Sequence, residues 1–221
     1  MIPSPLLEEA QLPKDLPAPP MILDSLGEYQ REVVTDSEEA RIWFDQGYNL
    51  MLSFNFNGAI RSFYQATIHD PEFAMAWWGI AYSSGPNINV PMIMPGPFAG
   101  WCYSASKKAA EFADQESLPN QAIIAALQKR YDWPMPEDLT ELNGAYRDAI
   151  LTVHEKFPMD SDIATLSVES MMLMQPWKYW SADGEPQGNT LQFKGIIEQV
   201  LNREPNHPAA CHLYIHIMES S

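Results

Sequence analysis

The stretch EARIWFDQGYNLMLSFNFNGAIRSFYQATIHDP, residues 39–71, decides the fold. Six positions form a pattern of large and small residues that ends in a proline. In chain order they are Trp43, Gly47, Ala59, Phe63, Ala66 and Pro71. In such a pattern a large residue anchors one helix, and small residues let a second helix pack closely against it. A proline then ends the second helix. The stretch therefore predicts two antiparallel helices joined by a short turn.

These six positions match the Trp, Gly, Ala, aromatic, Ala and Pro of a tetratricopeptide repeat (TPR), a helical pair of about 34 residues. Further helices are predicted at 74–84, 101–114, 121–131, 137–157, 160–174, 190–202 and from 208 onward, with irregular stretches at 85–98 and 175–189. The closing prolines are in places more than one repeat apart, so the array is degenerate. The expected fold is all-α, a right-handed α-solenoid of antiparallel helix pairs with long irregular loops.

The two ends of the chain differ from this array. Residues 1–36 are predicted to form a proline-rich N-terminal arm of extended backbone, because six of the first twenty residues are proline. Residues 37–221 form the TPR-like domain. The helix that starts at Pro208 lacks a partner, which predicts that this domain is truncated and that a C-terminal remainder of the same protein follows. No signal peptide is visible in this chain. Two locations are therefore considered: the cytoplasm, or export by means of a leader that is absent from this chain.

Composition narrows the function classes. The net charge of −16 and the pI near 4.5 argue against a nucleic-acid partner. No apolar run approaches the ~20 residues of a membrane span, so none is predicted. No phosphate-cradling glycine loop is present, and no nucleotide or organic cofactor is indicated. The two cysteines have no paired spacing, so no disulfide framework is predicted.

The chemistry is concentrated in HPAACHLYIHIMESS, residues 207–221. At 100° per residue, His212, His216 and Glu219 lie at about 0°, 40° and −20° around one helix. Two imidazoles and a carboxylate on one face are a reasonable ligand set for a divalent metal, here copper or zinc. The repeat frame adds Glu169 as a further candidate ligand, because it takes position 9 of the preceding first helix, as His216 does in its own. In a TPR such positions face the concave groove.

Other residues are candidates for the same groove. His207 precedes the helix and is predicted either to cap it or to lean towards the site. Asn87 and Asn89 in the loop 85–98 either bind a ligand or serve as turn residues. Tyr48 and Thr165 complete the groove candidates.

Two functional hypotheses remain open on these residues. The first is a metal site in the groove, and in its strongest form this hypothesis makes the protein a metal-dependent enzyme. The second is a non-catalytic scaffold that binds a peptide or partner protein. On the second hypothesis the histidines are a polar pair or bind acidic peptide, and Glu169 is a solvated carboxylate.

The loop 85–98 contains four prolines, which exclude regular helix. Its side chains Ile88, Val90, Met92, Ile93 and Met94 are too apolar to remain in water. We therefore expect the loop to fold back over the helices, with Asn87 or Asn89 hydrogen-bonded to backbone.

Several segments together resemble a family of large bacterial TPR proteins. They are FDQG at 44–47, WGIA at 78–81, GPNIN at 85–89, PWKYW at 176–180 and HPAACHLYIHIMES at 207–220. The resemblance covers about residues 25–221 and implies the TPR fold and a longer chain, often with an export signal. The chain departs from the family pattern at Phe56, where histidine is common, at Gly58 and at Lys178.

Overall fold

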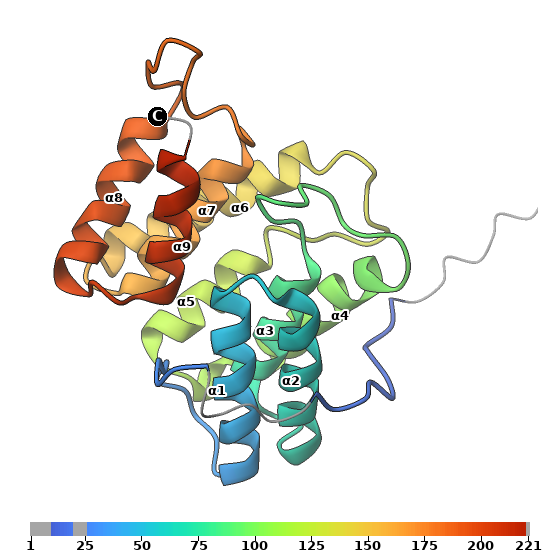
Figure 1. Cartoon of the computed structure of the whole chain (residues 1–221). Helices are drawn as coiled ribbons and strands as arrows, with labels where there is room; N and C mark the ends of the chain where they lie inside the picture. The colour runs from blue at the N-terminus through green and yellow to red at the C-terminus, as the bar shows by residue number, and fades with distance from the viewer. Residues whose placement is uncertain (1–9, 20–25, 220–221) are drawn as a thin grey trace, which may run out of the picture.

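The computed structural model describes residues 10–19 and 26–219. Within these ranges the chain is all-helical and contains no β-strand, which confirms the all-α part of the predicted fold (Figure 1). The described helices are α1 (Glu38–Leu52), α2 (Phe56–His69), α3 (Ala74–Ser84), α4 (Phe98–Glu111), the 3₁₀ turn η2 (Ala113–Gln115), α5 (Leu118–Leu127), α6 (Thr140–Lys156), α7 (Ser161–Leu173), α8 (Thr190–Arg203) and α9 (Pro208–Met218). Every predicted helix has a counterpart.

Local chemistry explains where several helices begin. The Ser37 hydroxyl accepts a hydrogen bond from the Ala40 amide at 3.1 Å and caps α1. The Asp160 carboxylate caps α7 in the same way, and α9 starts with a proline at its first helical position. These caps satisfy amide groups that a helix leaves without intrahelical partners.

The helices pack mainly on their neighbours in the chain, most closely along α1, α2, α3 and α4. The last helix, α9, also contacts α1 and α7, so the C-terminal end returns to the first helix (Figure 1). Phe63 of α2 lies between two glycines, Gly47 of α1 and Gly79 of α3, and touches the backbone of both helices. This is the close approach that the small residues of the opening stretch predicted.

The tight packing predicts a large effect of one methyl group. A Cβ atom added at Gly79 would lie 2.5 Å from the Phe63 ring, which cannot move because it is fully buried. We expect Gly79→Ala to lower the free energy of unfolding by about 2 kcal/mol in urea denaturation. The matched control is Gly144→Ala in α6, where a Cβ atom meets nothing within 4 Å. That variant should be stabilised by up to about 1 kcal/mol, and equal effects at both sites would contradict the packing argument.

The described parts of the N-terminal arm have no helix, as predicted, but they are firmly attached. The Arg61 guanidinium donates to the carbonyls of Pro17 at 2.6 Å and Ala18 at 2.8 Å. Arg31 is only 6% exposed and pairs with acidic residues of the domain. The arm is therefore part of the folded unit over residues 10–19 and 26–36, and its remaining residues lie outside the described ranges.

The loop between α3 and α4 confirms one expectation and corrects another. The Asn87 side chain accepts hydrogen bonds from the amides of Asn89 and Val90, both at 3.0 Å, and Ile88 is completely buried against α7, α8 and α9. In contrast, Met92 and Met94 are 59% and 51% exposed. The loop packs on the helices through Ile88 and again through the partly buried Ile93, while the side chains of Met92 and Met94 on either side of Ile93 extend into solvent.

No helix in the described ranges is long and apolar enough to cross a membrane.

Candidate functional site: a histidine pair on the last helix

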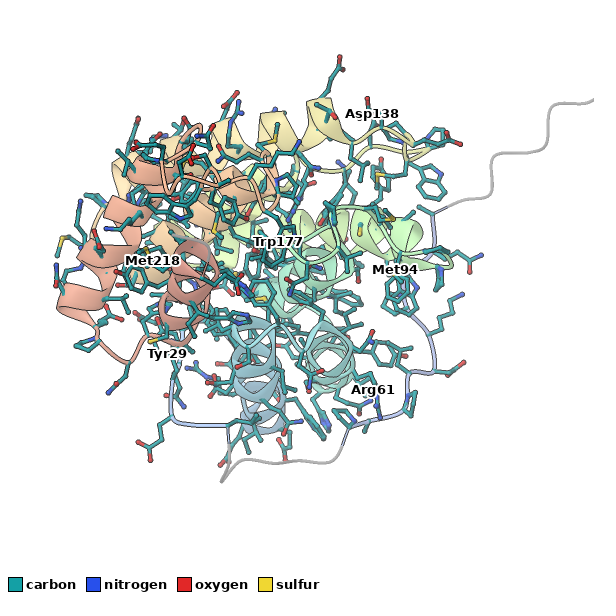
Figure 2. All side chains as sticks on the ribbon, turned by 45° about the horizontal axis from the view of Figure 1, so that its top comes forward. Tyr29, Arg61, Met94, Asp138, Trp177 and Met218 are labelled. Carbon is teal, nitrogen blue, oxygen red and sulfur yellow. The ribbon has the colours of Figure 1, made fainter. Side chains whose placement is uncertain are left out.

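The predicted histidines form a close pair. The Nε2 atoms of His212 and His216 on α9 face each other at 3.0 Å. The Phe54 ring lies over His212 with 4.2 Å between ring centroids, and the Trp177 ring meets His216 edge-on at 5.2 Å. The site therefore joins three segments: helix α9, the α1–α2 turn and the α7–α8 loop, where Figure 2 labels Trp177.

Both aromatic neighbours have unusual backbone. Phe54 has a φ angle of 60° and Trp177 a φ angle of 61°, in the left-handed region that bulky residues rarely adopt. Such a conformation costs on the order of 1–3 kcal/mol per residue and is common at functional sites. Trp177 is also 48% exposed. A strained backbone therefore holds a ring that faces solvent against His216.

Each imidazole has a further hydrogen-bond partner besides the other ring. His216 Nδ1 lies 3.0 Å from the Glu219 carboxylate. His212 has a hydrogen bond with the Leu52 backbone that raises its pKa, so the Leu52 carbonyl acts as acceptor. When neither Nε2 atom carries a proton, the two Nε2 lone pairs are directed at each other. Two lone pairs at this distance repel unless a proton or a cation lies between them.

The environment of His212 favours a neutral imidazole, the form that metal binding requires. Burial lowers the pKa of His212, and the neighbouring His216 lowers it further, against the smaller opposing effect of Leu52. A neutral histidine keeps the lone pair that a metal ion needs.

The predicted four-residue ligand set does not assemble around this pair. Within the described ranges no group of three or more His, Cys, Asp and Glu side chains is placed to hold a metal ion together. Glu219 lies beside Nδ1 of His216, a position from which a carboxylate commonly orients an imidazole whose other nitrogen binds a metal ion. Glu169 lies elsewhere, in the interior.

Glu169 is a buried acid. It is 5% exposed, and one oxygen, Oε2, accepts a hydrogen bond from the Tyr82 hydroxyl. The other, Oε1, finds no hydrogen-bond partner among the described residues. Burial raises the pKa of Glu169 to about 8, so the carboxyl is mostly protonated at neutral pH.

Glu169 lines a cavity of about 20 Å³, large enough for a single water molecule. Thr165 lines the same cavity, together with apolar residues of α1, α2 and α9. Thr165 is 3% exposed and donates to the Asp162 carbonyl at 2.8 Å. The interpretation of Glu169 as a solvated carboxylate is therefore wrong, and Thr165 also faces the interior.

His207 and Tyr48 belong to the interior as well. His207 caps α9, since its Nδ1 accepts from the Ala210 amide at 3.3 Å, and its Nε2 lies 3.3 Å from an oxygen of Asp162. Tyr48 is 1% exposed and has a hydrogen bond with the same Asp162. The capping alternative for His207 is confirmed, and Tyr48 does not line an open groove. Asn87 is a turn residue, and Asn89 is exposed beside it.

Sequence reasoning missed Phe54, Trp177 and the Leu52 carbonyl. Phe54 and Trp177 lie in turns, where the helical frame assigns no direction to a side chain. The motif PWKYW did mark Trp177 as part of an unusual loop, and this was the available signal. A backbone carbonyl leaves no trace in the sequence.

Comparisons of the chain with protein-family models, with curated proteins and with solved structures find no match.

Proposed function

We propose that this protein is a degenerate TPR-like array of helix pairs that binds one transition-metal ion through His212 and His216. The TPR-like part is supported by Gly47 and Gly79 packing on Phe63. It is also supported by the chain-order packing of the helices.

The observation that carries the metal site is the pair of Nε2 atoms at 3.0 Å, with further hydrogen-bond partners that hold the rings in place, the Glu219 carboxylate for His216 and the Leu52 backbone for His212. Metal–imidazole bonds are about 2.0–2.1 Å long, which places two nitrogens about 3 Å apart when they subtend 90° at the ion. At the tetrahedral angle the separation is about 3.4 Å. The pair therefore accommodates two adjacent ligands of a tetragonal ion almost without movement.

This geometry favours copper(II) over zinc. Tetragonal nitrogen and oxygen coordination is typical of copper(II), and copper(II) binds a given nitrogen site more tightly than zinc does. The remaining positions are then left to water or to an external ligand, because the described residues supply two imidazoles and no third metal-binding side chain.

The first test is a metal titration of the untagged protein. We expect one copper(II) ion per chain in calorimetry at pH 7.5, with weaker binding of zinc. His212→Ala or His216→Ala should abolish stoichiometric binding, because a single imidazole remains. Glu219→Gln should weaken binding by about tenfold, because it removes the carboxylate that orients His216.

His69→Ala is the matched control. His69 is exposed at the end of α2, outside the pair, and its loss should leave binding unchanged. Copper should also quench tryptophan fluorescence, and Trp177→Phe should reduce that quenching without reducing affinity, because the indole lies 5.2 Å from His216. If neither ion binds the wild-type chain, the histidines are a plain hydrogen-bonded pair and the proposal fails.

A further inference from the structure

A second surface, distinct from the histidine pair, has the features of a binding groove. It has a volume of about 750 Å³ and lies between residues 91–96 of the α3–α4 loop, residues 135–143 around the start of α6, and the end of α7. Small-molecule and peptide sites typically have volumes of about 300–1,000 Å³. Met94 and Asp138, both labelled in Figure 2, lie on opposite walls of this groove.

The walls are apolar and adaptable. Four methionines line the groove: Met92, Met94, Met135 and Met174. Two of them are more than half exposed, although the side chain of methionine is apolar. Methionine is flexible and polarisable, and surfaces that accept varied apolar partners use it often.

A buried polar group lies in the wall of the groove. Asn143 of α6 lines it and is 8% exposed, and its side-chain oxygen has no hydrogen-bond partner among the described residues. A buried acceptor without a partner destabilises the folded chain, because it has lost its hydrogen bonds to water and gained none. An N–H donor from a bound ligand would remove that destabilisation.

The charge at the rim is negative. Glu137 and Asp138 are exposed and line the groove, and no basic side chain is found among its described lining residues. Hydrogen bonds from Thr140 lower the pKa of Asp138, so this carboxylate is ionised at neutral pH. A basic group is the complement of such a rim, and the net charge of −16 strengthens the attraction.

The groove continues beyond the exposed methionines. Met92 and Met94 also line a second cavity of about 270 Å³, with Phe54, Phe56 and Phe98 among its other residues. A ligand that uses both cavities must cross these two side chains. An extended peptide can do so, with alternate side chains entering the cavities.

We infer that this groove binds a peptide segment in which basic residues alternate with apolar ones. The basic side chain lies between the Glu137–Asp138 rim and the Asn143 oxygen, and the apolar side chains pack on the methionines. The inference does not rest on the metal site, because the 750 Å³ groove shares no residue with it and the second cavity meets it only at Phe54.

The probe is a fluorescein-labelled ten-residue peptide that alternates leucine and lysine, followed by fluorescence anisotropy with the full chain. We expect saturable binding that weakens as salt is raised. Glutamate in place of lysine, or serine in place of leucine, should abolish binding. The double variant Glu137→Gln/Asp138→Asn should raise Kd at least about fivefold, since asparagine can still accept the hydrogen bond from the Thr140 amide but both charges are lost.

The matched control is Glu141→Gln/Glu155→Gln, which removes the same charge from exposed positions of the same helix outside the groove. It should change Kd by less than about twofold.

Met92→Ser/Met94→Ser tests the apolar component, and these side chains are exposed, so folding is preserved. Equal binding by the groove and control variants would overturn the inference, as would absence of saturable binding. A dimer that Met92→Ser/Met94→Ser converts to monomer would also overturn it, because the occupant would then be a second copy of the chain.

Discussion

Replacing Glu169 by glutamine should make the protein progressively more stable than the wild type as pH rises from 5.5 to 7.5. The difference in free energy of unfolding between the two proteins should grow by about 3 kcal/mol over this interval, measured by urea denaturation at several pH values. The cause is the burial of Glu169, which raises its pKa from an ordinary 4.5 to about 8.

The sign of this pH effect depends on whether the folded or the unfolded state binds the Glu169 proton more tightly. Between pH 4.5 and 8 the folded state keeps the Glu169 proton and the unfolded state loses it. The stability that this carboxyl contributes is therefore full below pH 4.5 and falls by about 1.4 kcal/mol per pH unit until about pH 8. The total loss is on the order of 5 kcal/mol. Glutamine cannot ionise, so its variant lacks this loss, and its amide oxygen can still accept from Tyr82.

The comparison needs a control that loses an exposed carboxyl. Glu141→Gln in the first turn of α6 provides it, because water solvates that position in both states. Its stability difference from the wild type should remain nearly constant with pH. A constant difference for Glu169→Gln as well would mean that solvent reaches the Glu169 carboxyl, and the buried acid would be disproved.

The helices were predictable because their signals are local. Prolines and capping side chains lie within a few residues of the ends that they determine, so the helix predicted at 190–202 differs from α8 by one residue. The helix predicted at 101–114 was less accurate, since α4 starts at Phe98 directly after Pro97 without a side-chain cap. A start of this kind depends on what the loop packs against.

The histidine pair was predictable from spacing, because both histidines lie on one helix. Glu169 was not, because all thirteen residues of α7 are buried and the helix has no solvent face. The repeat frame assigns Glu169 to a groove, but Tyr82 and the buried Ile88 of the α3–α4 loop lie against that position. This covering depends on residues about eighty positions away, which no local pattern encodes.

Replacing Arg31 by alanine should destabilise the protein by about 3–5 kcal/mol, although Arg31 lies in a proline-rich arm. Its guanidinium contacts Asp162 at 2.8 Å, Asp160 at 3.2 Å and the Asn120 side chain at 2.8 Å. Burial alone would raise the pKa of Asp162, but His207 and Arg31 outweigh it and keep that pKa below its ordinary value. Without Arg31, the buried Asp162 carboxylate loses the cation that compensates its charge.

Chemical denaturation of three further variants separates this explanation from a general loss of contacts. Lys194→Ala removes an exposed ion pair on α8 and should cost less than about 1 kcal/mol. Arg31→Lys should recover only part of the loss, because one ammonium cannot replace a planar group that bonds three partners. Arg31→Ala/Asp162→Asn should be more stable than Arg31→Ala alone, because the unpaired charge is removed as well.

Chymotrypsin should also cut faster after Tyr29 in Arg31→Ala, because Arg31 holds the arm on which Tyr29 packs against His207. A loss below about 1 kcal/mol with no faster cleavage would mean that the arm is attached by other contacts.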